Sequence, residues 1–215
     1  MRITAASRGR VTIPAEVRRR LGIRPLTSAR MEDLGRVLRG SWGNGCWCMF
    51  PRMTPQQERA LPGPGTPAER RRKAMAELSR RRTAPGLLAY RDGEVVGWVA
   101  VAPRVELRRV DASKATPRVD ESPVWVIPCI TVRRNARGAG VAVALIRAAV
   151  AYAASRGAPA VEAYPRAGRV RVHDDFAYYG TEPLFRRAGF SVIRRPLKGL
   201  PKNWTPRVTM RVDCR

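Results

Sequence analysis

Residues 132–142 read VRRNARGAGVA. This run stands between an apolar segment typical of a strand, residues 124–132, and a long apolar, alanine-rich segment typical of a buried helix, residues 140–156. The first backbone N–H groups of a helix have no partner within the helix and lie at the positive end of its dipole. Glycine lets a ligand approach such a backbone closely. The run therefore predicts a strand, a turn that binds a pyrophosphate, and a helix.

The turn differs from two common phosphate-binding loops. It lacks the Lys-Ser/Thr pair of a Walker P-loop and the three-glycine spacing of a dinucleotide-binding turn. Its pattern Arg137-x-x-Gly140-x-Ala142 resembles instead the R/Q-x-x-G-x-G/A signature of the GNAT acetyltransferase superfamily.

The order of the elements around the turn strengthens this resemblance. A hairpin and a strand precede the turn, and a long helix and another strand follow it. The segment LFRRAGF, residues 184–190, then resembles the closing helix-to-strand signature of the family. The resemblance covers roughly residues 86–212, with an extension back to the region of Cys46. It implies an α/β (α+β) fold with a mixed, mostly antiparallel, splayed sheet flanked by helices.

The resemblance also implies an activity, the transfer of an acetyl or other acyl group from acyl-CoA to a primary amine. The amine attacks directly in a ternary complex, without a covalent enzyme intermediate. The backbone of Ile130 and Val132 would pair with the acyl-pantetheine arm like an added strand, and the Ile130 N–H would stabilise the developing oxyanion. The cofactor-binding residues implied are Ile130, Val132, Arg137, Gly138, Ala139, Gly140, Val141, Ala142 and Phe185.

Two positions depart from the family pattern. Many members have a tyrosine four residues before the closing Gly-Phe, where it protonates the departing thiolate, and this chain has Phe185 there. Many also have an acidic residue just before the cofactor-binding strand residues, where this chain has Pro128 and Cys129. The usual general acid and base are therefore missing from their usual places.

Glu162, Tyr178 and Tyr179 are the catalytic candidates that replace them. Glu162 lies between Val161 and Ala163, which we expect to face a core, so its side chain points from the opposite face of the strand. It either faces the site as a base or is a solvated edge-strand residue. Each tyrosine hydroxyl either reaches the sulfur of the thioester or belongs to a ring that packs a loop.

The other elements follow from local signals. Asp92-Gly93 supplies the positive φ angles of a tight hairpin turn between residues 87–90 and 95–101. Thr54 and Thr66, each followed by proline, begin two helices, and the second runs to about Arg82 with Met75 directed inward. A polar loop or short helix spans residues 104–122. The remaining strands are expected at 160–164, 190–194 and 207–212, and a short helix at 182–188.

The N-terminal residues 1–25 have a different character. Their run from Ser7 to Ile23 resembles the first half of an AbrB/SpoVT-type DNA-binding domain, with a short strand, a helix begun by Pro14 and a stop at Gly22. No second half follows, and half a barrel cannot bury its own strands. We therefore expect residues 1–30 to be a remnant or an over-called extension, and residues 31–215 to form the acyltransferase domain.

The composition leaves the partner open. The chain has 215 residues, 42 Lys+Arg against 17 Asp+Glu, and a net charge of +25. Such a surface attracts polyanions, although only four of the 42 are lysines, as expected if genome composition favours arginine. The expected partner is a small-molecule or protein amine acceptor. Alternatives are an acidic carrier protein that supplies the thioester, or a nucleic acid bound by an AbrB-like regulator fused to a GNAT-like domain.

The cysteines and the single histidine indicate no metal site. Cys46 and Cys48 form the only close pair among four cysteines, and His173 is the only histidine. Two reduced thiols, one of them buried, are the favoured interpretation of Cys46 and Cys48. No apolar run is long enough to span a bilayer, and no signal core precedes the domain. We expect a cytoplasmic protein, with a homodimer left open.

Overall fold

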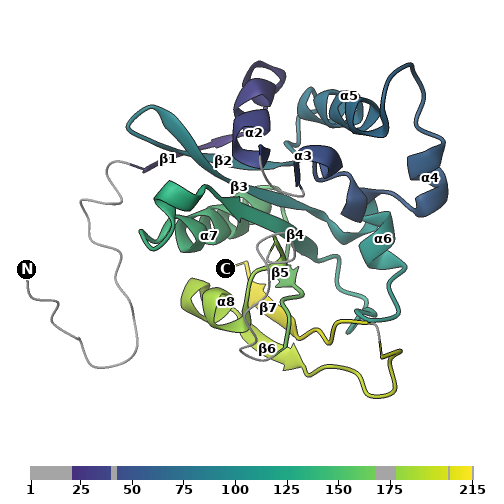
Figure 1. Ribbon diagram of the computed structural model, residues 1–215. Helices are drawn as coiled ribbons and strands as arrows, with labels where there is room; N and C mark the ends of the chain where they lie inside the picture. The colour runs from purple at the N-terminus through teal and green to yellow at the C-terminus, as the bar shows by residue number, and fades with distance from the viewer. Residues whose placement is uncertain (1–20, 40–42, 168–177, 203, 215) are drawn as a thin grey trace, which may run out of the picture.

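The computed structural model describes residues 21–39, 43–167, 178–202 and 204–214 (Figure 1). Its strands are β1 (Leu21–Pro25), β2 (Gly86–Arg91), β3 (Glu94–Pro103), β4 (Trp125–Val132), β5 (Ala160–Ala163), β6 (Ser191–Arg194) and β7 (Thr209–Asp213). Its helices are α2 (Met31–Leu38), α3 (Gly43–Cys46), α4 (Pro55–Arg59), α5 (Pro67–Ser79), α6 (Arg108–Asp111), α7 (Val141–Ala154) and α8 (Glu182–Ala188). Short 3-10 turns are η1 (Ser28–Arg30), η2 (Phe50–Arg52), η3 (Arg104–Glu106) and η4 (Arg134–Ala136).

The described strands form one sheet in the order β1-β2-β3-β4-β5-β7-β6. β4 and β5 run parallel, and the other neighbouring pairs are antiparallel. The mixed, mostly antiparallel sheet expected from the sequence is thus confirmed.

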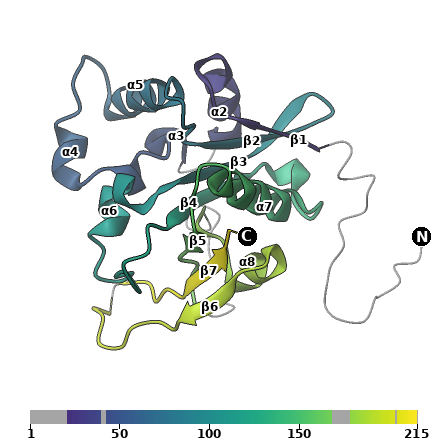
Figure 2. The same ribbon diagram turned by 180° about the vertical axis from the view of Figure 1, so that it is seen from behind.

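Helices cover both faces of this sheet (Figures 1 and 2). α7 and α8 pack on one face, where Leu145 and Phe185 join strand residues such as Val99 and Ile127 in the main core. α2 and α5 pack on the other face, over the strand residues that alternate with these. No helix in the described ranges is long and apolar enough to cross a membrane.

Local sequence signals account for most of the boundaries. Thr54 and Thr66 cap α4 and α5 with complete capping boxes, as their spacing to Gln57 and Glu69 predicts. The turn between β2 and β3 contains Asp92 and Gly93, both at positive φ. α5 ends at Ser79 rather than near Arg82, because the arginine run that follows turns away from the helix.

A bulge in β4 opens the centre of the sheet. Ala100 pairs with Cys129 and Ala102 with Val126, so two residues of β4, Ile127 and Pro128, lie opposite one residue of β3. A bulge bends the strand that carries it, and a proline is tolerated there because it has no N–H to give to the ladder. The pairing of β4 with β5 ends at the same place, at Ile127 and Ala163. The two parallel strands therefore diverge beyond Ile127.

The start of the fold differs from the expectation. Residues 21–25, which the AbrB-like interpretation ended with a helix stop at Gly22, form strand β1 and pair with β2 along its whole length. Leu26 is fully buried against α2 and β2, and its N–H bonds to the Gly86 carbonyl at 2.9 Å. The boundary expected at residue 30 would therefore separate strand β1 from the rest of its sheet. The rest of the AbrB-like motif, residues 1–20, lies outside the described residues.

Removing β1 should therefore destabilise the protein. A chain that begins at Met31 loses β1 and Leu26, so we expect a clearly lower thermal unfolding midpoint. Leu26→Ala alone should cost about 2–5 kcal/mol, because it empties a fully buried site. Arg24→Ala, an exposed position on the same strand, is the control and should stay within about 0.5 kcal/mol. An unchanged midpoint for the chain starting at Met31 would show that the sheet does not need β1.

Candidate functional site

The open edge of β4 is the first component of the site. The N–H of Arg133 bonds to the Val96 carbonyl on β3 at 2.9 Å. Backbone groups of a strand alternate between its two edges, so those of Thr131 and Cys129 also face β3, and those of Val132 and Ile130 face the opposite edge. That edge has no pairing with β5 beyond Ile127. The backbone of Ile130 and Val132 is thus directed into the space between the diverging strands.

The turn after β4 is the second component. Gly138 and Gly140 both have φ of +77°, and Gly140 is the N-cap of the fourteen-residue helix α7. A Cβ on Gly138 would meet no atom within 4 Å, so the backbone there is open to a ligand. The Nε of Arg137 donates to the Val132 carbonyl at 3.3 Å, which places the guanidinium next to the turn.

These features fit the pyrophosphate of CoA. The backbone from Gly138 to Ala142 lies at the positive end of α7, and Arg133 and Arg137 add positive charge nearby. These residues would hold the phosphates, and the edge of β4 would hold the pantetheine arm.

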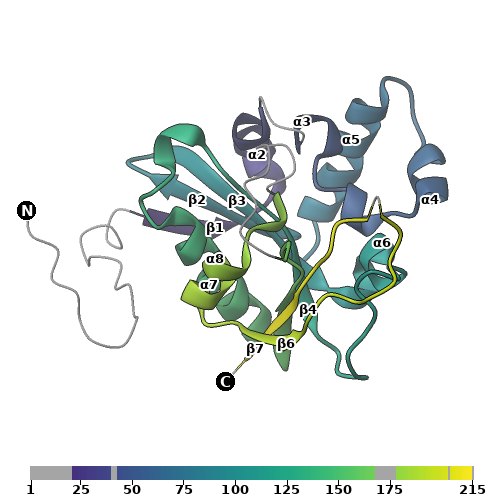
Figure 3. The ribbon, with the colours of Figure 1, turned by 60° about the horizontal axis from the view of Figure 1, so that its bottom comes forward.

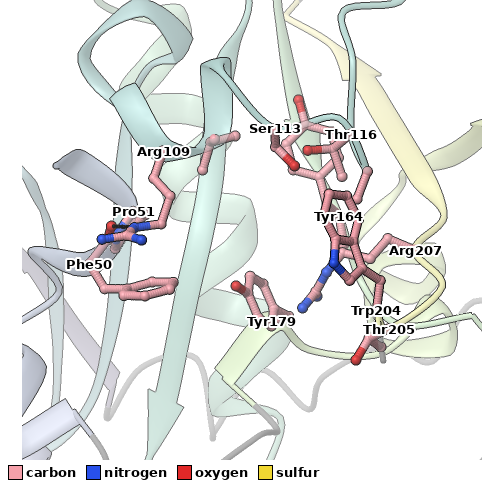
Figure 4. Close-up of a pocket in the computed structure, with 12 residues that line it drawn as sticks. Phe50, Pro51, Arg109, Ser113, Thr116, Tyr164, Tyr179, Trp204, Thr205 and Arg207 are labelled. Atoms are coloured by element: carbon pink, nitrogen blue, oxygen red, sulfur yellow. Dashed lines mark hydrogen bonds between the residues drawn. The ribbon is translucent and has the colours of Figure 1, made fainter. Parts of the chain in front are cut away.

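A pocket of about 380 Å³ is the third component. Segments far apart in the sequence line it, and the chain between β6 and β7 reaches it on the side of α6 (Figure 3). Phe50 and Arg109 form one side, and Tyr164, Arg207 and Trp204 form the other, with Tyr179 between them (Figure 4). The other lining residues are Pro51, Val110, Ser113, Ala115, Thr116 and Thr205.

Tyr178 and Tyr179 connect this pocket to β4. Their rings lie 4.0 Å apart between centroids. Tyr179 lines the pocket, and Tyr178 packs against the cluster that contains Cys129, next to Ile130. Burial raises the pKa of the Tyr178 hydroxyl, as does its hydrogen bond with Tyr179, so this group stays protonated at neutral pH. The structure thus brings both predicted tyrosines between the pocket and the open edge.

Glu162 lies on the central strand β5, so the solvated edge-strand interpretation is wrong. Its side chain is 1% exposed. Arg211 donates to Oε1 at 2.6 Å, and the Tyr164 hydroxyl donates to Oε2. Arg104 donates to the Tyr164 hydroxyl and lies 3.6 Å from Oε2. The carboxylate is therefore part of a buried network, and Tyr164 connects that network to the pocket wall.

Cys129 directly precedes Ile130, and a second cysteine lies against it. The sulfur atoms of Cys48 and Cys129 are 3.5 Å apart, and the Trp98 indole N–H donates to Cys48 at 3.0 Å. The hydrogen bond from Cys129 lowers the pKa of Cys48, helped by Trp98 and the nearby Arg52, against the effect of burial. The pKa of Cys129 is raised by the same bond. Both thiols are free and buried.

Phe185 contributes to packing. It is completely buried in the main core, with its ring 5.1 Å from that of Phe190. A ring with no exposed surface offers no contact to a ligand, so its expected cofactor role gains no support from this position. His173 and Trp42 lie outside the described residues. No group of three or more metal-binding side chains occurs among the residues that are described.

Comparison with known proteins gives the class. Residues 51–178 match the acetyltransferase (GNAT) family, and the chain belongs to this family. It is an acetyltransferase that uses acyl-CoA and acts on an amine. No curated protein sequence gives a significant match.

Several solved structures share the fold. A ribosomal-protein-alanine N-acetyltransferase from Brucella melitensis is 19% identical, with a TM-score of 0.54 over 89% of this chain and 99% of that one. A Salmonella typhimurium protein solved with its cofactor acetyl-CoA is 14% identical, with a TM-score of 0.53 over 91% and 95%. PaiA N-acetyltransferase from Thermoplasma acidophilum, in complex with coenzyme A, is 12% identical, with a TM-score of 0.50 over 90% and 98%.

Sequence reasoning missed the pocket walls. No sequence motif contains Phe50, Arg109, Tyr164, Trp204 or Arg207. Phe50 and Arg109 lie in the short elements η2 and α6, Tyr164 directly follows β5, and Trp204 and Arg207 lie between β6 and β7.

The turn can be tested by placing a negative charge in it. Gly140→Asp puts a carboxylate beside the expected phosphates, so CoA affinity measured by calorimetry should fall at least about tenfold, or ~1.4 kcal/mol. Gly157→Asp is the matched control, because Gly157 also has positive φ, +80°, and nothing within 4 Å of its Cβ, but follows the other end of α7. Undiminished CoA affinity in a folded Gly140→Asp variant would place the cofactor elsewhere.

The network beneath the pocket should be sensitive to acid. Burial by itself would raise the pKa of Asp111, but hydrogen bonds from Arg118 and Arg104 bring it below its ordinary value. The stabilisation is thus present above the unfolded pKa, about 3.9, and is lost as the pH falls through the folded value. We expect the thermal midpoint to drop between about pH 5 and pH 3, and Asp111→Asn to flatten the drop. Asp92→Asn, in an exposed turn, is the control; equal profiles for both variants would contradict the assignment.

Proposed function

We propose that the edge of β4 and the turn before α7 bind acyl-CoA, and that the pocket beside Tyr179 binds the amine that receives the acyl group. The observation that carries this proposal is how β4 pairs with its two neighbouring strands. Its backbone at Ile130 and Val132 faces an edge that β5 does not cover, and the strand leads directly into the glycine turn. A pantetheine arm has amides that can pair with such an edge as an added strand would.

Bound acyl-CoA supplies an acyl group activated as a thioester. The amine nitrogen attacks the carbonyl carbon, a C–N bond forms as the C–S bond breaks, and the thiolate leaves with the electron pair. The Ile130 N–H is proposed to donate to the carbonyl oxygen as negative charge develops there. Holding the amine and the thioester together supplies much of the rate, because the reaction then needs no bimolecular encounter.

Two protons must move in this reaction. Tyr178 or Tyr179 is proposed to protonate the thiolate, because both lie between the pocket and β4. Glu162 is proposed to accept the amine proton through water or through Tyr164, whose ring lines the pocket and whose hydroxyl donates to the carboxylate. A primary amine with a pKa near ~10.4 is mostly protonated at pH 7, so a base helps most at low pH.

The acceptor is proposed as a class of compound, and the location as a cellular compartment. A small molecule or a protein N-terminus would each supply a primary amine. The described cysteines are all free thiols, which is consistent with the reducing cytoplasm that we propose as its location.

Mass spectrometry of the purified protein tests the cofactor. We expect CoA or an acyl-CoA to be retained, and its retention to be lost in Gly140→Asp. Retention of nucleic acid instead of CoA, lost steeply with salt, would contradict the proposal and favour a DNA-binding regulator.

Variants test the proton routes once an acceptor is in hand. We expect Glu162→Gln and Tyr164→Phe to lower kcat/KM by about 10²–10⁴-fold near neutral pH, with a deficit that shrinks at high pH as the amine loses its proton unaided. Tyr178→Phe or Tyr179→Phe should lower kcat. Tyr90→Phe, which loses a bond from β2 to Asp33 and does not line the pocket, controls for loss of a tyrosine hydroxyl. Wild-type rates from all four site variants would leave a site that works by positioning alone.

A further inference from the structure

The charges in the pocket indicate what the acceptor carries besides its amine. The charged residues among those that line the pocket are Arg109 and Arg207, and none of the lining residues is acidic. Arg109 has a counter-ion, because its Nη2 lies 2.9 Å from Glu58. Its Nε donates to the Phe50 carbonyl, and its guanidinium lies over the Phe50 ring. Arg109 is therefore held in place as part of the wall.

Arg207 is in a different situation. Its guanidinium lies 3.3 Å from the centroid of the Tyr179 ring, and its Nη1 donates to the Tyr164 carbonyl at 3.1 Å. Burial lowers the pKa of this guanidinium. Within the described ranges its side chain has no ion pair with a carboxylate.

A half-buried charge without a counter-ion is costly, and a ligand that brings an anion removes that cost. The bond to Tyr164 uses Nη1, and Nε and Nη2 make no hydrogen bond to another described residue, so these two atoms can act as a two-pronged donor. This fork matches the two oxygens of a carboxylate. Because the guanidinium lies over the Tyr179 ring, the anion would bind beside Tyr179 in the pocket wall.

Aromatic rings form much of the rest of the wall. The rings of Phe50, Tyr164, Tyr179 and Trp204 all line the pocket, and Trp204 is 38% exposed at its rim. A volume of about 380 Å³ lies at the small end of the range for sites that take small molecules. The pocket thus combines aromatic walls with a guanidinium that has no carboxylate partner among the described residues.

We propose that the acceptor is a small primary amine that also carries a carboxylate and an aromatic or apolar body, with Arg207 binding the carboxylate. This inference rests on the proposed function, because it assigns the amine-binding pocket of that same site. The aromatic walls hold the body of the acceptor, and the carboxylate on Arg207 fixes its orientation so that the amine points to the edge of β4.

Matched amines test the role of the carboxylate. The two pairs are phenylalanine with phenethylamine, and 4-(aminomethyl)benzoate with benzylamine, each assayed with acetyl-CoA by release of the free thiol. Within a pair the body and the amine are alike and the carboxylate is present or absent. In phenylalanine the carboxylate lies next to the amine, and in 4-(aminomethyl)benzoate it lies at the opposite end, so the two pairs cover both arrangements. We expect kcat/KM to be at least about tenfold higher for the acid of at least one pair.

Arg207→Met should bring that ratio close to one, and Arg207→Lys should keep part of it, because lysine retains the charge but not the fork. Arg195→Met is the control and should keep the wild-type ratio. Arg195 follows β6 in the same segment, pairs with Glu182 on the exposed surface and does not line the pocket.

Three results would overturn the inference. They are equal kcat/KM within both pairs, a preference that survives Arg207→Met, and no acetylation of any of the four amines. If Arg207→Met does not fold, the kcat/KM ratios of the wild-type protein and of Arg207→Lys test the inference instead. CoA binding to the wild-type chain, measured by calorimetry, separates this test from the proposed function. If CoA binds but neither acid is preferred over its matched amine, the proposed acyl-CoA site is retained and only the carboxylate inferred on the acceptor is rejected.

Discussion

The separation of β4 from β5 is the constraint on which the rest of the structure depends. Backbone N–H and C=O groups need partners, and a central strand normally finds them on both sides. Here one side of β4 loses its neighbour beyond Ile127, where the bulge at Pro128 bends the strand. The other side stays paired with β3, which holds the open edge straight. A protein can keep such an edge in the middle of a sheet only where a ligand or solvent satisfies it.

The elements on the two faces of the sheet support the gap between β4 and β5 in different ways. α7 begins directly after the turn and packs on β2, β3 and β4, so the N-terminus of the helix is fixed relative to the open edge. On the opposite face, Glu162, Arg104 and Arg211 form a buried ionic network beside the small hydrophobic cluster that contains Tyr164. Burying such a group without its partners is costly, so each member fixes the position of the others. Tyr164, bonded into this network, is held rigidly at the pocket wall.

Local signals explain why so much of the fold could be predicted. Capping residues, the Asp92-Gly93 turn and the glycine turn before α7 act over a few residues, and each was found in the sequence. β1 was missed because its five residues include Gly22, Arg24 and Pro25, which show no strand pattern of their own. Pairing with β2, more than sixty residues away, makes it a strand. The glycine turn before α7 was found because it is contiguous, whereas the pocket is built from separate segments. Arg207 could not be singled out among 42 basic residues, since its surroundings are set by folding.

Arg24 and Pro25, which weaken the strand pattern of β1 in the sequence, also affect the edge of the sheet. An unpaired outer strand is a template on which another polypeptide can add and start an aggregate. The outermost strands of the described sheet are β1 and β6, of five and four residues. Pro25 has no N–H to offer a newcomer, and Arg24 puts a charge beside it. On the far side, Arg194 is tied to the carbonyls of Pro117 and Arg118. Both edge strands are thus poor templates for fibril growth. This protects a long continuous sheet from aggregation while the chain is still folding.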